Sequence, residues 1–187
     1  LLELLRTLDR EVRAAGGRVY LGTFPSEVRP EHVTGEVLRE IKGLVDNRRL
    51  NIGAQTGSDR LLKATGRGHT SEDVLNAVRS AVEYGFEVDV DYMFGLPGED
   101  ADDLAETIKH IDRVVGLGGR ARCHVFMPLP GTPYSFAPPG RVPEAVRGRL
   151  LRLVGRGRLR GQWIRQEELA RRIAQLLSLI HISEPTR

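Results

Sequence analysis

Two phrases in this chain each join a short apolar segment to a polar, glycine-containing turn that precedes a helix-start signal. They cover residues 50–59 (LNIGAQTGSD) and 87–99 (EVDVDYMFGLPGE). Apolar segments of this length, followed by such turns and about a dozen helical residues, predict repeated βα units and therefore a parallel sheet. The carboxyl ends of parallel strands meet on one rim, where α/β barrels carry their binding and catalytic groups. The sequence therefore predicts an α/β chain whose function is located on a single rim.

The rest of the chain extends this pattern to four strands, each followed by a helix. Thr34, Ser58 and the pair Thr70 and Asp73 are typical of helix starts. Right-handed crossovers would make all four strands parallel. The expected strands span residues 18–23, 50–55, 87–94 and 120–127, and two arginine-rich helices are expected at residues 143–154 and 161–176 after a proline-rich loop.

The chain is short for a complete eight-unit barrel, which usually needs about 250 residues. It begins with Leu1 inside an expected helix, so we expect its N-terminus to be missing. We divide it into a barrel part at residues 1–140 and an arginine-rich helical extension at residues 141–176. Residues 177–187 (LSLIHISEPTR) resemble the translated read-through of a sequencing adapter, in contrast to the arginine-rich remainder, and we exclude them from the fold.

Charge and cysteine content limit the class of protein. Residues 141–172 hold ten arginines and three glutamates, which suits contact with RNA or simply a solvated helix face. The lone Cys123 excludes a disulfide framework, favours a cytoplasmic protein and is expected to be a small buried side chain. No apolar run approaches the roughly 18 residues of a membrane span, so no membrane partner is expected.

Four phrases in a fixed order carry a resemblance to a known family. They are SEVRP, IGAQTGSD with RGHT, DYMFGLPGE, and HVFMPLPGTP. Together they resemble the C-terminal part of the catalytic barrel of radical S-adenosylmethionine (SAM) enzymes. The chain looks most like the cobalamin-binding members and is also similar to the tRNA methylthiotransferases. The resemblance implies an incomplete parallel (β/α) partial TIM barrel, the last four strands of a six-strand barrel, followed by C-terminal helices.

The resemblance also implies cofactors and partners. These are SAM, a 4Fe-4S cluster and, for the cobalamin-binding members, cobalamin, together with a reductant protein of the flavodoxin or ferredoxin type. The three-cysteine motif of the family does not occur here, so its cluster ligands are expected upstream of Leu1. We identify no metal ligand and no catalytic residue within the chain, and the substrate, a small molecule or RNA, cannot be derived from it.

Seven positions match cofactor-binding positions of the family. The resemblance implies that Glu27 binds the ammonium group or ribose of SAM, Gln55 its ribose hydroxyls and Arg67 its carboxylate, the last through two parallel hydrogen bonds. It implies that Asp91 contacts the cofactor as well. Read from the residues alone, these four could equally be loop, surface or core side chains. The remaining matched positions, where backbone would approach the ligand, are Gly57, Gly95 and Leu96.

The leading hypothesis is therefore a fragment of a radical SAM enzyme, which cleaves SAM reductively at its cluster to drive a radical modification such as methyl transfer. The alternatives are a tRNA methylthiotransferase and a non-catalytic barrel that binds a nucleotide or RNA. A hydrolase, kinase or dehydrogenase is not supported, because the chain lacks their nucleophile-elbow, phosphate-loop and dinucleotide motifs. The fragment alone is expected to be inactive.

Overall fold

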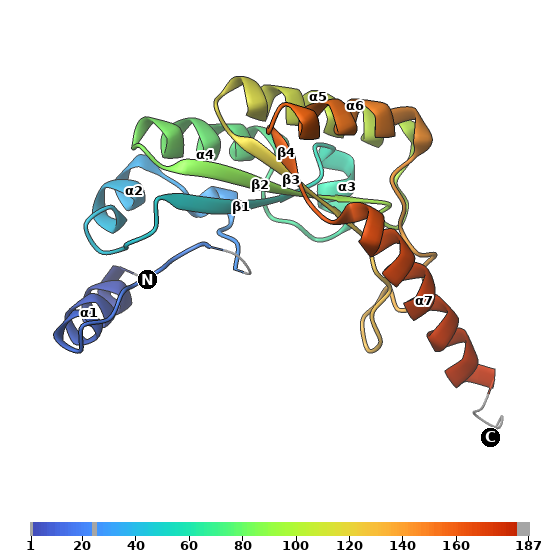
Figure 1. Cartoon of the computed structure of the whole chain (residues 1–187), viewed down its shortest axis with the longest axis horizontal. Helices are drawn as coiled ribbons and strands as arrows, with labels where there is room; N and C mark the ends of the chain where they lie inside the picture. Colours follow the sequence, from blue (N-terminus) through green and yellow to red (C-terminus); the bar gives the residue numbers. More distant parts are fainter. Residues whose placement is uncertain (1, 24–25, 183–187) are drawn as a thin grey trace.

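The computed structural model describes residues 2–23 and 26–182. Within these residues four strands form a single parallel sheet in the order of the chain (Figure 1). Alternate side chains of the central strands are apolar and fully buried, among them Ile52, Val90 and Tyr92, which is the pattern of a sheet covered by helices on at least one face. The strands are β1 (Arg49–Gln55), β2 (Glu87–Phe94), β3 (Arg120–Val125) and β4 (Leu159–Arg160).

The helices begin where the sequence predicts them. The Thr34 and Ser58 side chains each accept a hydrogen bond from the first turn of the following helix, and Thr70 and Asp73 form the predicted capping box. Asp100 caps the next helix in the same reciprocal way with Asp103. The helices are α1 (Leu2–Ala14), the 3-10 turn η1 (Pro30–His32), α2 (Gly35–Ile41), α3 (Asp59–Ala64), α4 (Ser71–Glu83), α5 (Ala101–Gly116), α6 (Glu144–Gly155) and α7 (Trp163–Ile182).

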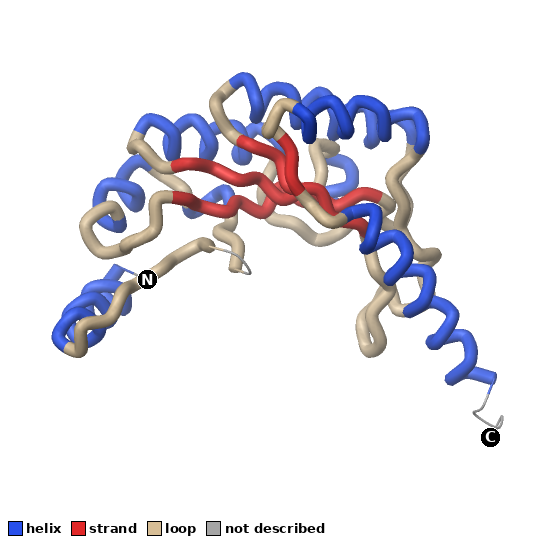
Figure 2. Tube along the Cα trace, in the orientation of Figure 1, coloured by secondary structure: helices blue, strands red, loops and turns tan. Residues whose placement is uncertain are grey.

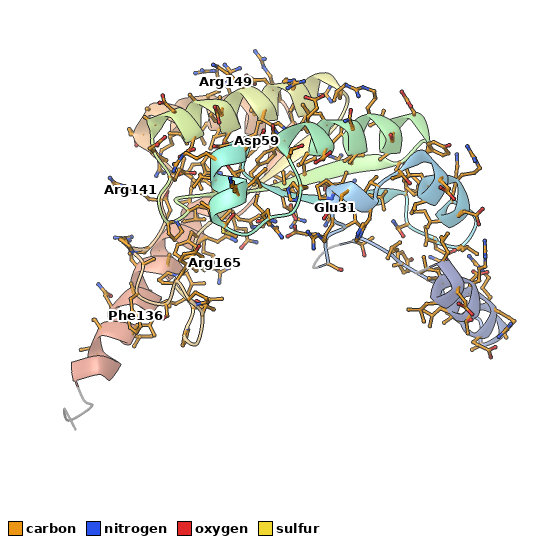
Figure 3. All side chains as sticks on the ribbon, turned by 180° about the vertical axis from the view of Figure 1, so that it is seen from behind. Glu31, Asp59, Phe136, Arg141, Arg149 and Arg165 are labelled. Atoms are coloured by element: carbon orange, nitrogen blue, oxygen red, sulfur yellow. The ribbon has the colours of Figure 1, made fainter. Side chains whose placement is uncertain are left out.

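Helices α4, α5 and α6 cover one face of the sheet (Figures 1 and 2). On that side the Tyr92 hydroxyl lies 2.7 Å from His110 Nδ1, and His110 Nε2 lies 2.8 Å from the Ser71 carbonyl oxygen. Arg149 of α6, on the outer side of this layer (Figure 3), pairs with Asp112 of α5 at 2.5 Å. These contacts hold the helices on the sheet and on one another. We therefore expect the groups that bind a ligand to lie on the opposite face.

The expected first strand, residues 18–23, is not formed. This segment does run beside β1, since the Asn51 N–H donates to the Gly22 carbonyl at 2.7 Å. However, the N–H groups of Val19 and Leu21 are taken by the side chains of Asp46 and Asn47, at 2.8 and 3.0 Å. A residue whose N–H is bonded to a side chain cannot give that N–H to a strand ladder.

The structure instead adds a strand that the sequence did not predict. β4 has only two residues and pairs with β3 through Ala121 with Leu159 and Arg122 with Arg160. It comes from the expected arginine-rich extension, between the two predicted helices. A two-residue strand has too few positions to show alternation, which is why the pattern gave no signal there.

Helix α7 runs beyond the expected end at residue 176 and continues to Ile182. Leu176 and Leu179 are both 60% exposed. The assignment of residues 177–187 to an adapter stays a prediction, and residues 183–187 lie outside the described residues. Among those described, no helix combines the length and apolarity of a membrane span.

Candidate functional site

The sheet face that α4, α5 and α6 leave uncovered is polar. Successive strand residues alternate between faces, so the residues between the buried apolar ones point to the uncovered face. They are Asn51 and Gly53 on β1, Asp89 and Asp91 on β2, and Arg120, Arg122 and His124 on β3. A charged sheet face of this kind cannot pack against an apolar layer. It is suited to binding a polar ligand.

Glu27 reaches this face from the loop before η1. Its Oε2 accepts a hydrogen bond from Gln55 Nε2 at 2.8 Å. The carboxylate lies over Gly53, at the place where a side chain on that residue would begin. Gly53 is in turn the register partner of Asp91 on β2. The glycine thus allows two carboxylates from distant parts of the chain, Glu27 and Asp91, to lie side by side.

Gln55 ends β1 in an unusual backbone conformation. Its φ is +68°, and among the described residues it is the only non-glycine residue with a positive φ. The register of β1 with β2 also shifts between Gly53 and Gln55. Backbone strain of this kind persists where the surrounding structure requires it, often at a binding site. Here it turns the Gln55 side chain toward Glu27.

Charges from three other segments act on Glu27. Although the residue as a whole is exposed, burial of its carboxylate raises the pKa of Glu27, and the neighbouring charge of Asp91 raises it further. Arg67, His124 and the hydrogen bond from Gln55 act in the opposite direction. Glu27, Gln55, Arg67 and Asp91, far apart in the sequence, therefore come together in one cluster.

Asp91 is almost completely buried, with 4% of the residue exposed. Its Oδ1 lies 3.4 Å from Arg122 Nη1 and 3.6 Å from His124 Nε2, and it has no hydrogen-bond partner among the described residues. A buried carboxylate oxygen without a hydrogen bond is costly. A ligand that donates to this oxygen would remove the cost.

His124 belongs to the cluster, although the sequence did not identify it as a binding residue. Gln166 of α7 holds it: Gln166 Oε1 accepts from the Val125 N–H at 3.1 Å, and Gln166 Nε2 lies 3.2 Å from His124 Nδ1. Because an amide nitrogen only donates, Nδ1 must accept and the neutral ring carries its proton on Nε2. That proton faces Asp91. In the sequence His124 lies within the expected strand 120–127, two residues before Phe126, and nothing there indicated this role.

The three other predicted binding positions lie outside the cluster. A β-carbon on Gly57 would meet His110 Cβ at 2.5 Å, so its close neighbour is α5. Gly95 has φ +71° and packs against Gly140. Leu96 is half-buried. For Gly57 and Gly95, contacts within the protein already account for the glycine, and a cofactor role for Gly57, Gly95 and Leu96 stays a prediction.

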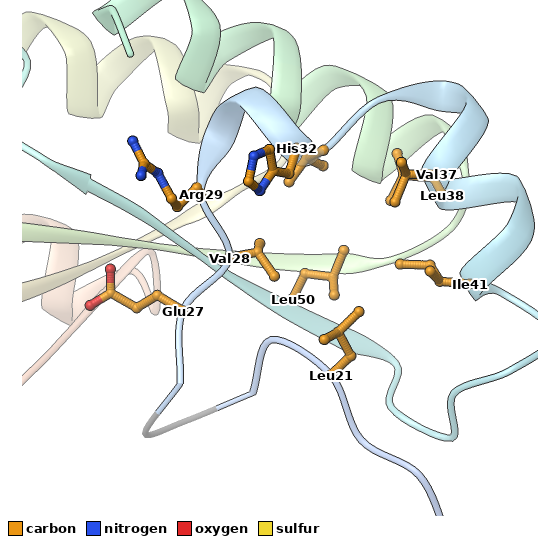
Figure 4. A pocket seen from close by; sticks show the side chains of 10 residues that line it. Leu21, Glu27, Val28, Arg29, His32, Val37, Leu38, Ile41 and Leu50 are labelled. Atoms are coloured by element: carbon orange, nitrogen blue, oxygen red, sulfur yellow. The ribbon is translucent and has the colours of Figure 1, made fainter. Parts of the chain in front are cut away.

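A cavity of about 190 Å³ adjoins the cluster between α2, η1 and β1. Figure 4 shows Glu27 and Arg29 at one end, and Leu21, Leu50 and Ile41 at the other. The Glu27 carboxylate points away from the apolar end. Glu27 therefore serves the polar sheet face rather than this cavity.

The described residues do not supply a cluster or metal site. No group of three or more His, Cys, Asp or Glu side chains among them is arranged to hold a metal ion. Cys123 is buried, and burial raises its pKa well above the usual range, which keeps it a thiol. A 4Fe-4S cluster, which needs several thiolates, does not fit the residues present.

The chain is similar to several known proteins. The Radical SAM superfamily profile matches residues 1–111. The heme chaperone HemW of Bacillus subtilis (strain 168) is 38% identical over 114 residues, which are 60% of this chain and 28% of HemW. The tRNA-2-methylthio-N(6)-dimethylallyladenosine synthase of Halorhodospira halophila (strain DSM 244 / SL1) is 37% identical over 113 residues, 59% of this chain and 23% of the synthase. The chain thus spans about a quarter of the length of these two relatives.

Two solved structures are similar in fold. Coproporphyrinogen III oxidase HemN from Escherichia coli gives a TM-score of 0.63 at 21% identity, covering 84% of this chain and 38% of HemN. The methyltransferase TsrM from Kitasatospora setae, solved with cobalamin and a 4Fe-4S cluster bound, gives 0.56 at 21% identity, covering 73% of this chain and 27% of TsrM. These likenesses confirm the predicted α/β fold of the partial-barrel type.

Proposed function

This chain belongs to the radical SAM superfamily, and from that premise we propose that it forms the part of a radical SAM enzyme that holds SAM. The enzymes of this superfamily use SAM with a 4Fe-4S cluster, which supplies the electron for cleavage. Because no ligand set for that cluster lies among the described residues, we assign the chain the positioning of SAM and none of the cluster chemistry.

The observation that carries the proposal is the pair of carboxylates at Gly53. Glu27 and Asp91 lie side by side, the charge of Asp91 raises the pKa of Glu27, and Asp91 Oδ1 lacks a hydrogen bond among the described residues. Two such carboxylates are stabilised by a cation that donates hydrogen bonds between them. SAM carries an ammonium group, whose N–H donors would satisfy the pair, whereas its sulfonium has no hydrogen to donate and adds only its positive charge.

The other cluster members suit the remaining groups of SAM. Arg67 is half-buried, and its charge lowers the pKa of Glu27, so the two side chains belong to the same cluster. The Arg67 guanidinium suits the SAM carboxylate, which lies next to the ammonium group. Gln55 has both a donor and an acceptor for ribose hydroxyls. His124 presents its Nε2 proton beside Asp91, with Nε2 3.6 Å from Asp91 Oδ1.

The direct test of enzymatic function uses the protein encoded by the complete gene, with its cluster reconstituted. Incubated without oxygen with SAM and dithionite, it should release 5′-deoxyadenosine. Asp91→Asn should slow the release roughly 10-fold or more, because it removes a charge worth about 1.5–3 kcal/mol in a hydrogen bond. Asp102→Asn, an exposed residue in the first turn of α5, is the matched control and should not change the rate. Absence of 5′-deoxyadenosine from the wild-type reaction would refute the proposal.

A tRNA methylthiotransferase is the second candidate. The observation favouring it is the 37% identity to a tRNA-2-methylthio-N(6)-dimethylallyladenosine synthase. The arginine-rich helices α6 and α7 suit contact with RNA. Incubation of the complete protein with undermodified tRNA and SAM, followed by nucleoside mass spectrometry, should then show a methylthio mass increase. Methyl transfer with cobalamin, as suggested by the fold of TsrM, would instead give methylated product and no methylthio group.

A further inference from the structure

His69 is a buried histidine with a polar neighbour on each side of its ring. Only 4% of the residue is exposed, and it lies in the loop between α3 and α4. On one side, Nε2 lies 3.4 Å from the Ala54 carbonyl oxygen of β1. On the other side, Nδ1 lies 3.8 Å from Oε2 of Glu31, a residue of η1 that is labelled in Figure 3. The ring therefore lies between β1 and the segment that leads into α2.

A neutral ring cannot satisfy both neighbours. A carbonyl oxygen only accepts, so the contact with Ala54 requires the proton of a neutral ring to be on Nε2. Nδ1 then presents a lone pair to Glu31 Oε2, which is also an acceptor. Both atoms are buried, and neither has a hydrogen-bond partner among the described residues. Two such acceptors that face each other are costly, whereas a second ring proton, on Nδ1, allows a charge-assisted hydrogen bond.

The charged groups around the ring favour that second proton. Arg29 takes the other oxygen of Glu31, Oε1, at 2.7 Å and so leaves Oε2 to His69. A second carboxylate, Asp73 of α4, lies close enough to interact with the ring. The Thr70 N–H and hydroxyl, both 2.7 Å away, lower the pKa of Asp73, and the charge of His69 lowers it further. Two carboxylates near the ring thus stabilise a positive charge on it.

The Ala54 carbonyl is the point at which His69 acts on the candidate site. Ala54 lies within the register shift of β1 against β2, between Gly53 and Gln55. Its carbonyl belongs to the planar peptide group that precedes Gln55, so a hydrogen bond to it restrains the Gln55 backbone. That backbone has the φ of +68°, a conformation that persists only where the surroundings hold it. His69 thereby helps to turn the Gln55 side chain toward Glu27.

We propose that His69 is a positioning residue for the SAM site: its ring, protonated on both nitrogens, donates to the Ala54 carbonyl and to Glu31. These two hydrogen bonds join the three segments that carry cluster residues. Glu31 follows Glu27 by four positions, Ala54 precedes the end of β1, and His69 follows Arg67 by two positions. The effect on SAM rests on the proposed function, whereas the state of the ring can be measured without SAM.

The first test is nitrogen-15 nuclear magnetic resonance of the imidazole rings in the 187-residue chain at neutral pH, without SAM. His69→Phe assigns the His69 signals by their loss. Both ring nitrogens of His69 should carry a proton. Glu31→Gln should remove the proton on Nδ1, because the neutral amide can donate to Nδ1 instead. An unprotonated Nδ1 in the wild type would overturn the proposal, whatever the variants show.

The second test is the affinity for SAM, measured by equilibrium dialysis. His69→Phe keeps a ring in the space but removes both donors, so it should weaken binding roughly 10-fold or more and shift the backbone resonances of Gln55. His69→Ala takes its place if circular dichroism shows that the larger ring prevents folding. Glu31→Gln should bind SAM nearly as well as the wild type, because its amide restores the link in neutral form. His32→Ala, at an exposed histidine of η1, is the control and should change neither quantity.

Equal SAM affinity in the folded His69 variant and the wild type would overturn the positioning role. A loss in Glu31→Gln as large as that in the His69 variant would also overturn it, because Glu31 would then act on SAM through its own charge. The state of the ring separates this inference from the proposed function. If His69 is doubly protonated and Gln55 responds to its replacement, but the wild type does not bind SAM, the positioning of Gln55 stands and the proposed function falls.

Discussion

The carboxylate of Glu27 occupies the space that a side chain on Gly53 would need. This relationship joins the loop before η1 to the middle of β1 and sets Glu27 next to Asp91, the register partner of Gly53. It makes the glycine a requirement of the site rather than of the strand, because the φ of Gly53 is not in the left-handed region.

Gly53→Ala should therefore weaken SAM binding while the sheet remains intact. The added methyl group displaces the Glu27 carboxylate and breaks its hydrogen bond with Gln55. The loss of one charged hydrogen bond, about 1.5–3 kcal/mol, corresponds to roughly 10- to 100-fold in affinity. Equilibrium dialysis with labelled SAM measures it. Gly43→Ala is the control, since a methyl group there meets no atom within 4 Å. Equal affinity in the two variants would contradict the prediction.

Gly57→Ala should lower the stability of the fold and leave the affinity for SAM unchanged. A β-carbon at Gly57 would come within 2.5 Å of His110 Cβ and 2.8 Å of Thr107 Cα. Overpacking of this kind typically costs about 1–3 kcal/mol. Urea unfolding should show that loss of stability, whereas the affinity of the folded protein for SAM should stay unchanged. A loss of SAM affinity without a loss of stability would restore Gly57 as a ligand-binding residue.

Glu99 should make the stability of the chain depend on pH. Burial raises the pKa of Glu99 from 4.5 to about 7, although one of its oxygens accepts the Gly95 N–H at 2.8 Å. The folded state therefore keeps a proton that the unfolded state loses. The resulting stability is complete below the unfolded pKa of 4.5 and is lost as the pH rises through about 7.

The free energy of unfolding should thus fall by up to about 3 kcal/mol between about pH 5 and about pH 9. Glu99→Gln should remove most of this fall, because the neutral amide can still accept from Gly95. Denaturant titrations at several pH values measure the difference between variant and wild type. Glu83→Gln, at the exposed end of α4, is the control and should keep the wild-type slope. An identical slope in Glu99→Gln would show that Glu99 is not the group responsible.

Gln166→Glu should change the protonation of His124. The amide nitrogen that donates to Nδ1 is replaced by an acceptor, so the ring proton moves from Nε2 to Nδ1. Nitrogen-15 resonances of the imidazole ring distinguish the two tautomers. Gln175→Glu, exposed on the same helix, should leave the tautomer unchanged. A wild-type His124 already protonated on Nδ1 would contradict the assigned hydrogen-bond direction.

Local signals in the sequence predicted much of the fold. Capping residues such as Ser58 and Thr70 act within their own helices, so the starts of α3 and α4 could be placed from the sequence. Residues 18–23 could not be assigned correctly, because the acceptors that take their N–H groups, Asp46 and Asn47, lie 27 and 26 positions away. Contacts over such distances leave no periodic trace.

Part of the candidate site was predicted from the sequence, and its role in binding SAM stays a prediction. Family resemblance led to Glu27, Gln55, Arg67 and Asp91, and the structure brings these four together. Neither the role of Gly53 nor the position of His124 could be derived, since both depend on how a loop and a C-terminal helix return to the sheet. The positive φ of Gln55 is likewise a property of the folded strand end.

The most direct test of the account is the binding of SAM to the 187-residue chain, measured by equilibrium dialysis for the wild type and for Glu27→Gln, Arg67→Gln and Asp91→Asn. The account predicts saturable binding of one SAM per chain and a loss of roughly 10-fold or more in each variant, with circular dichroism showing that all remain folded. Unchanged affinity in Glu27→Gln and Asp91→Asn, or no saturable binding by the folded wild type, would contradict it.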